Sequence, residues 1–145
     1  MVMKKVLYIL IFFFFILSVP TESFAQCNPA SLSKECITKI QDGFIFVKSF
    51  NVDGQQGAKE KVEYSYVMTR DTQYFMNVCT PEEDSDGIIV TIYDSKRNPV
   101  STNYADGKFF PALIFECKAT GIYYIVYTFQ DSKHYCGGSA LPFKK

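Results

Sequence analysis

The sequence predicts an all-β protein, an antiparallel β-sandwich of about seven strands with one short helix at its N-terminal end. After residue 43 the apolar residues recur at every second position, the period of a β-strand. Turn-forming segments then follow at intervals of roughly 8–15 residues, as in sandwiches of short strands. Hydrophobic residues make up 48% of the chain and aromatic residues 17%, which excludes an intrinsically disordered protein.

The first 25 residues have the layout of a secretory signal peptide. Two lysines precede the unbroken apolar run Val6–Leu17, and small residues precede the Ala25–Gln26 bond, where we expect cleavage. As a helix this run of 12 residues would span only ~18 Å, too short to cross the ~30 Å hydrocarbon core of a bilayer. Gln26 stands before Cys27 where a lipoprotein signal has a small residue. A lipid anchor is therefore disfavoured.

We therefore expect a signal peptide over residues 1–25 and a single domain over residues 26–145. The domain is expected to be secreted, into the periplasm or the exterior, without a transmembrane segment. It keeps 13 basic and 14 acidic residues, because the leader removes two lysines and one glutamate from 15 of each. Such a balanced charge argues against nucleic acid or an anionic membrane as a partner.

The helix is expected first, with Asn28 as its cap and Pro29 as its first residue. An apolar stripe at Leu32, Cys36 and Ile40 follows, and Asp42-Gly43 is expected to end the helix. The strands are then expected at residues 44–52, 62–68, 74–79, 88–93, 112–117, 122–129 and 139–143.

Two of these strands have a predicted place in their sheet. The segment Ile122–Phe129 is apolar at both odd and even positions, which indicates a central strand buried on both faces. The last strand contains Pro142, which favours an edge because proline lacks a backbone N–H group.

The strand series from Val62 to Phe143 resembles the bacterial pre-peptidase C-terminal domain. That family has an "LYD" strand followed by a "GTYYI" strand, and here Ile92-Tyr93-Asp94 precedes Gly121-Ile122-Tyr123-Tyr124-Ile125. The segment Tyr64-Ser65-Tyr66-Val67 is similar as well. The resemblance implies a jelly-roll-like sandwich and a non-catalytic accessory or binding role, although the chain departs from the family in carrying five cysteines.

The cysteines predict disulfides, since an exported chain meets an oxidising compartment. Two bridges that leave one thiol free can be drawn in fifteen ways, and the sequence does not select among them. We favour one bridge within the strand cysteines Cys79, Cys117 and Cys136, and a local pair between Cys27 and Cys36. Zinc is disfavoured because no two cysteines have the spacing of a zinc motif.

No set of catalytic residues is recognisable. His134 and Cys136 have the types of a base and a nucleophile, but a disulfide-bonded sulfur cannot attack a substrate. Ser139 follows two glycines, yet the second glycine of a nucleophile elbow is absent at Leu141. A pair of carboxylates brought together by the fold remains open, because sequence spacing does not reveal one.

Two further features are candidates for binding. Glu82, Asp84 and Asp86 lie in an acidic loop whose oxygens suit calcium, although the pattern matches only part of a calcium-binding loop. Tyr123 and Tyr127 share one face of a predicted strand, where they could form an aromatic platform or fill the core. No other cofactor is indicated.

The sequence therefore predicts a secreted, non-catalytic binding or structural protein of the bacterial envelope or exterior, with a protein or glycan partner. The alternatives are a glycoside-acting enzyme that uses two carboxylates and a small secreted inhibitor or effector.

Overall fold

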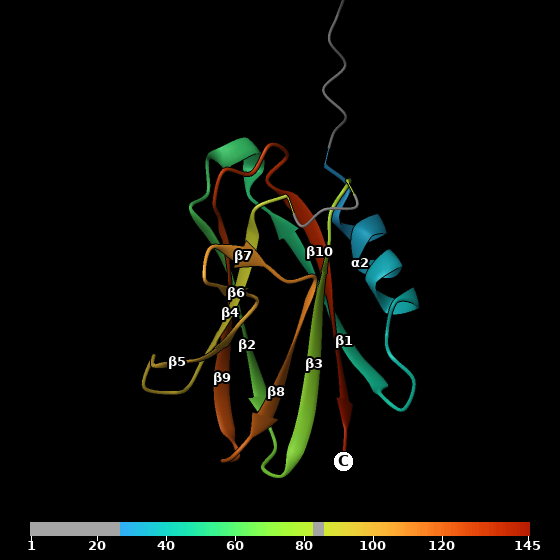
Figure 1. The fold of residues 1–145 in the computed structure, drawn as a ribbon, viewed down its shortest axis with the longest axis vertical. Coiled ribbons are helices and arrows are strands. Elements are labelled where there is room, and N and C mark those ends of the chain that lie inside the picture. The colour runs from blue at the N-terminus through green and yellow to red at the C-terminus, as the bar shows by residue number, and fades with distance from the viewer. Residues whose placement is uncertain (1–26, 83–85) are drawn as a thin grey trace, which may run out of the picture.

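The computed structural model describes residues 27–82 and 86–145, so the predicted leader and Asp84 lie outside the described residues. The fold is an antiparallel β-sandwich with one helix packed on its outside (Figure 1). One sheet has the order β1-β10-β3-β8, and the other has the order β2-β9-β4-β5. The elements of the first sheet and its helix are α2 (Pro29–Thr38), β1 (Ile45–Asp53), β3 (Thr72–Cys79), β8 (Ala112–Cys117) and β10 (Cys136–Lys144). The second sheet is built from β2 (Lys61–Met68), β4 (Ile88–Tyr93), β5 (Pro99–Thr102) and β9 (Gly121–Phe129).

The first half of the chain pairs with the second half in reverse order. β1 pairs with β10, β2 with β9, β3 with β8 and β4 with β5, all antiparallel. This nesting makes one long hairpin, which rolls up when β10 also joins β3 and β9 joins β4. The result is the jelly-roll arrangement, which confirms the predicted fold class.

The seven expected strands are all present, and the described residues add three short ones that the sequence analysis missed. β5 begins with Pro99, and β6 (Tyr104–Ala105) and β7 (Lys108–Phe109) form a two-stranded hairpin. These pieces of two to four residues are too short for an alternating pattern to show. Their pairing depends on the turns that join them.

The core lies between the two sheets and is filled by alternate residues of each strand. On β9 the inward residues are Tyr123, Ile125 and Tyr127, and all three are buried. β9 lies between β2 and β4, so its predicted central place is confirmed. Its outer face is only partly covered, since Ile122 is exposed.

The predicted edge position of the last strand is wrong, because β10 lies between β1 and β3 in the middle of its sheet. The bridges between β10 and β3 stop after Ala140 and resume at Phe143 in the same register. Pro142 falls within this interruption. The sheet therefore tolerates a proline at its centre by omitting backbone pairing where the N–H group is missing.

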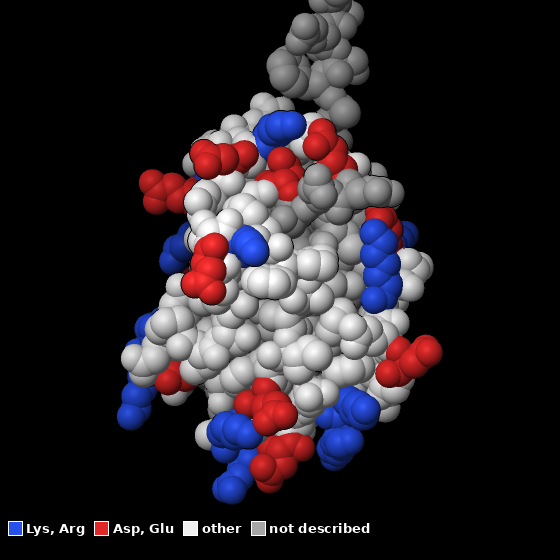
Figure 2. Space-filling model, viewed as in Figure 1, with Lys and Arg blue, Asp and Glu red and all other residues white. Residues whose placement is uncertain are grey.

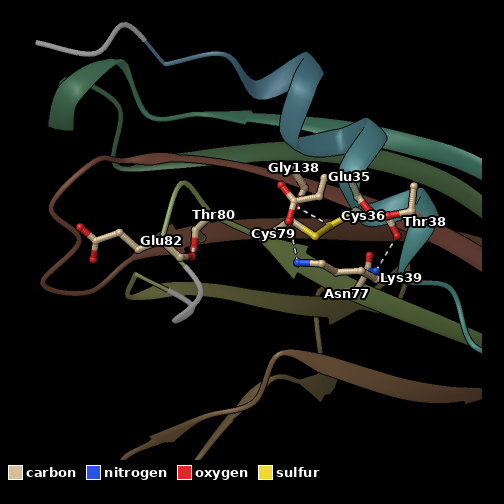
Figure 3. Close-up of polar contacts among 9 residues, drawn as sticks. All are labelled: Glu35, Cys36, Thr38, Lys39, Asn77, Cys79, Thr80, Glu82 and Gly138. Carbon is tan, nitrogen blue, oxygen red and sulfur yellow. Dashed lines mark hydrogen bonds and ion pairs between the residues drawn. A yellow bond between two sulfur atoms is a disulfide. The ribbon is translucent and has the colours of Figure 1, made fainter.

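Helix α2 begins as predicted, since the Asn28 side chain accepts a hydrogen bond from Ser31 N at 3.1 Å and Pro29 is the first helical residue. It packs across β10 and β1. Asn77 joins helix and sheet, because its amide N–H donates to Cys36 O at 2.8 Å (Figure 3). Its amide oxygen accepts from Ala140 N at 3.0 Å. The backbone of α2 comes so close to Gly138 that there is no room for a side chain there.

Two disulfides hold this helix to the sheet. Cys27 is joined to Cys136 at the start of β10, and Cys36 is joined to Cys79 at the end of β3. The expected local pair of Cys27 with Cys36 is therefore wrong, and so is the expected bridge within Cys79, Cys117 and Cys136. Both bridges connect the helix region to strands distant in sequence, and Cys117 is the buried free thiol.

The close packing of α2 can be tested at Gly138. We expect Gly138→Ala to lower the free energy of unfolding by about 1–3 kcal/mol, because the added methyl group overlaps backbone atoms of Leu32 and Ser33. Gly121→Ala is the matched control, since a methyl group at Gly121 meets nothing within 4 Å. Urea denaturation of both variants measures the difference. Equal midpoints would contradict the described packing.

The disulfide pattern predicts the reactivity of each cysteine. Cys117 has an exposed fraction of only 1%, so we expect iodoacetamide to leave it unmodified in the native protein and to modify it after denaturation. Peptide mapping without reductant should recover Cys27 with Cys136 and Cys36 with Cys79. Recovery of Cys117 in a bridge would refute the assigned pairing.

Candidate functional site

A hollow among the described residues is a groove between the edges of the two sheets, beside the β8–β9 turn. It has a volume of about 670 Å³. One wall comes from the β4–β5 hairpin and β5, and the other comes from β8 and the turn into β9. We call it the edge groove. The residues that line it are Asp94, Ser95, Lys96, Asn98, Val100, Ser101, Ile114, Phe115, Glu116, Lys118, Ala119, Thr120, Gly121, Ile122 and Tyr123.

The edge groove exposes aliphatic side chains to solvent. Val100 is 41% exposed, Ile114 50% and Ile122 49%. Val67, also exposed, lies directly opposite Ile122 in the β2–β9 pair. A cluster of exposed aliphatic residues in a concave place is typical of a binding surface.

The remaining contacts between the two sheets explain why the hollow lies here. On the opposite side of the sandwich, the Tyr64 hydroxyl donates to Asn51 O at 2.6 Å and so links β2 to β1. Near β5, the buried Asn103 amide accepts from Val90 N at 2.8 Å and donates to Phe110 O at 3.0 Å. The edge groove lies beside β5 and β8, at the opposite ends of the two sheets from β1 and β2.

Phe115 and Tyr123 form the floor of the edge groove, and their ring centroids are 5.4 Å apart. The Tyr123 hydroxyl donates to Ala119 O at 2.8 Å. Burial of the phenol, with a smaller contribution from the Cys117 thiol, raises the pKa of Tyr123 to about 12. Tyr123 is therefore neutral at physiological pH, and the floor carries no charge.

The charged residues of the edge groove interact with their neighbours. The Asp94 carboxylate accepts hydrogen bonds from Asn98 and from Lys96 N, and the Asn98 bonds contribute most to lowering its pKa. Glu116 pairs with Lys118 at 2.8 Å, and this bond lowers the pKa of Glu116. The Lys96 ammonium makes no ion pair with any described side chain. Its charge acts on the Asp94 carboxylate and contributes to lowering the pKa of Asp94.

The candidate aromatic platform of Tyr123 and Tyr127 is wrong, because both side chains point into the core. Tyr123 is 6% exposed and Tyr127 0%. The strand β9 was correctly predicted, but its outward face carries the residues that alternate with Tyr123 and Tyr127. Tyr124 lies on that face opposite Tyr93, and the Arg97 guanidinium lies 3.6 Å from its ring centroid. The polar partners on β2, such as Ser65 opposite Tyr124, could have indicated which face meets water.

Two of the three calcium candidates are described, and both bind within the protein. Asp86 accepts hydrogen bonds from Ser132 Oγ and from the backbone N–H groups of Lys133 and His134, and so organises the turn before β10. Glu82 lies 3.1 Å from His134 Nε2. Within residues 27–82 and 86–145, no group of three acidic, histidine or cysteine residues is placed to hold a metal ion. Calcium binding by this loop stays a prediction.

The catalytic candidates gain no support from their surroundings. Cys136 is bonded to Cys27, and Ser139 is buried in the sandwich. Every carboxylate that the structure describes is exposed or half-buried. Where a shift in a carboxyl pKa is resolved, at Glu63, Asp94 and Glu116, its direction is downward. A general acid for glycoside hydrolysis needs a raised pKa.

The floor of the edge groove predicts an alkaline loss of stability. The unfolded chain releases the Tyr123 proton near pH 10 and the folded chain near pH 12, so the free energy of unfolding falls as pH rises between these values. We expect Tyr123→Phe to make this fall less steep and to cost about 1 kcal/mol at neutral pH through the lost hydrogen bond. Tyr124→Phe, on the outer face, is the control. Urea titrations at several pH values test this, and identical slopes in all three proteins would contradict it.

The comparisons with known proteins found distant structural similarities. No family model matches the chain, and no curated protein sequence matches it. Among solved structures, the chain is similar to a periplasmic lysozyme inhibitor of g-type lysozyme from Aeromonas hydrophila. The identity is 13%, the match covers 72% of this chain and 91% of the other, and the TM-score is 0.45.

It is also similar to the pre-peptidase C-terminal domain of a collagenase from Bacillus anthracis. The identity is 15%, the match covers 69% of this chain and 90% of the other, and the TM-score is 0.46. The chain thus has a weak similarity to the family that its strand motifs resemble.

Proposed function

We propose that this chain is an exported, non-catalytic binding protein that contacts another protein through the edge groove. The observation that carries the proposal is the exposure of Val100, Ile114 and Ile122 in one groove. Aliphatic surface of this kind gains free energy when a partner removes it from water.

Export is supported by the leader-like sequence and by the two disulfides. Disulfides form and persist in oxidising compartments, and both of these connect distant parts of the fold. No helix within the described ranges has the length and apolar character needed to span a membrane. An extracellular or periplasmic place therefore fits the chemistry of the domain.

A protein partner fits the edge groove better than a glycan does. Sugars are commonly bound against exposed aromatic rings, whereas the two rings of the edge groove, Phe115 and Tyr123, are buried in its floor. The exposed positions are aliphatic, and the charged rim surrounds them. An exposed aliphatic surface of this kind also suits a secreted inhibitor or effector.

Site-directed photocross-linking tests the proposal. A photoreactive benzoylphenylalanine replaces Ile114 in the chain that is exported by its producing cell. We expect a covalent adduct with a second protein after irradiation, and we expect Ile122→Lys in the same chain to reduce its yield about tenfold or more, because a charge is placed in the aliphatic contact.

Ile45→Lys provides the matched control, since Ile45 is 62% exposed and lies on β1 outside the edge groove. It should leave the adduct unchanged. Both variants must keep the unfolding midpoint of the parent. An adduct that survives Ile122→Lys, or no adduct at Ile114 while a photoreactive residue at Ile45 gives one, would reject the edge groove as the contact surface.

A further inference from the structure

We propose that the Cys27–Cys136 disulfide is a site of thiol–disulfide exchange. A dithiol reductant enters a pocket at the start of α2 and attacks Cys27 Sγ, while the Cys36–Cys79 disulfide stays closed and the fold is kept. This inference does not depend on the edge groove. It rests on the pocket beside the bridge, on the different burial of the two bridges, and on the contacts that hold α2.

The pocket lies between the start of α2 and the segments that follow β3 and precede β10. It has a volume of about 250 Å³, and both cysteines of the Cys27–Cys136 bridge line it. The other lining residues are Asn28, Ser31, Leu32, Pro81 and His134. We call it the sulfur pocket. A water molecule in the liquid occupies ~30 Å³, so the sulfur pocket has room for a thiol group and the carbons that carry it.

The two bridges differ in their access to solvent. Cys27 is half-buried, and Cys136 has an exposed fraction of 1%. The Cys36–Cys79 bridge lies between α2 and the sheet in an apolar cluster with Ala140, and its residues are 0% and 4% exposed (Figure 3). A smaller hollow of about 130 Å³ borders Cys79 but not Cys36. Because exchange depends on access to the sulfur that is attacked, we expect it to begin at Cys27.

The exchange balances in two steps. One thiolate of the dithiol attacks Cys27 Sγ and forms a mixed disulfide with it, and Cys136 leaves as a thiolate that takes up a proton. The second thiolate of the same dithiol then attacks its own sulfur in the mixed disulfide and releases Cys27, which also takes up a proton. The dithiol is oxidised to a cyclic disulfide, and the protein bridge has gained two electrons and two protons.

The charges near the sulfur pocket decide which probe is used. None of the lining residues is an aspartate, glutamate, lysine or arginine, and the nearby Glu82 lies 3.1 Å from His134 Nε2. Helix α2 begins toward the upper end of the view in Figure 1, and Figure 2 shows charged side chains of both signs at this end. An uncharged dithiol in 0.15 M salt is therefore the probe, since salt screens charges farther than ~8 Å from the reacting sulfur.

Other contacts hold α2 on the sheet when the Cys27–Cys136 bridge is open. The buried Ser33 hydroxyl donates to Phe50 O at 2.7 Å. The Asn77 amide N–H donates to Cys36 O at 2.8 Å, and the Cys36–Cys79 disulfide lies beside it. All of these contacts are made within or below the helix itself. Reduction of the outer bridge therefore frees the segment before the helix from β10 without removing the helix.

Graded reduction tests the proposal. The native, exported protein is treated with dithiothreitol for increasing times, quenched with acid, unfolded and alkylated, and its peptides are identified by mass spectrometry. We expect the Cys27–Cys136 bridge to open at least about tenfold faster than the Cys36–Cys79 bridge, while the circular dichroism of the protein stays native. Cys117 is alkylated in every sample and serves as the internal standard. In guanidinium the two bridges should open at similar rates.

The point of attack and the path of entry are tested separately. In a short exposure to mercaptoethanol, the mixed disulfide should be found on Cys27 rather than on Cys136. Ser31→Trp places an indole ring at the sulfur pocket and should slow the opening of the bridge about tenfold. Thr38→Trp is the matched control, because Thr38 is exposed on the same helix and does not line the sulfur pocket. It should leave the rate unchanged.

Several results would overturn the proposal. They are equal rates for the two bridges in the native protein, earlier opening of Cys36–Cys79, and opening that coincides with the loss of native circular dichroism. Mercaptoethanol attached to Cys136 would refute attack at Cys27. Equal rates in Ser31→Trp and Thr38→Trp would refute entry through the sulfur pocket.

Discussion

Backbone pairing between the two halves of the chain is the constraint on which the whole structure depends. Each strand of the first half finds its antiparallel partner in the second half, and two further pairings roll the resulting hairpin into a sandwich. This arrangement pairs each interior strand on both sides and leaves four edge strands in the two large sheets. The way each edge is treated therefore decides where the protein can meet another molecule. β1 and β5 carry register shifts, β5 begins with a proline, and Glu63 of β2 and Glu116 of β8 each pair with a lysine.

The sequence predicted the strands that alternate over six or more residues, because their side chains must divide between core and solvent. Met68 is fully buried at the end of such a series, and Val67 beside it is exposed. It also predicted the start of the helix, since Asn28 and Pro29 act locally. The sequence did not predict the place of β10. Pro142 favours an edge on the assumption that every residue of a central strand is paired on both sides, and β10 is not paired with β3 at Pro142.

The edge groove could not be predicted at all from the sequence. Its exposed residues Val100, Ile114 and Ile122 come from three strands and adjoin only after the two sheets have packed. The disulfides were hidden for the same reason, since each joins residues separated by 43 or 109 positions. The pair Tyr123 and Tyr127 illustrates a finer difficulty. The apolar residues identified the strand. Because β9 is apolar at both odd and even positions, its sequence does not indicate which face is exposed to solvent.

The central place of β10 has a consequence for how the protein is made. β10 completes the first sheet and follows all the other described strands in the sequence. Among the described residues, β1 has no other strand partner. The first sheet therefore cannot close before β10 has been synthesised. The disulfide between Cys27 and Cys136 then joins the segment before helix α2 to this strand, across a sequence separation of 109 residues.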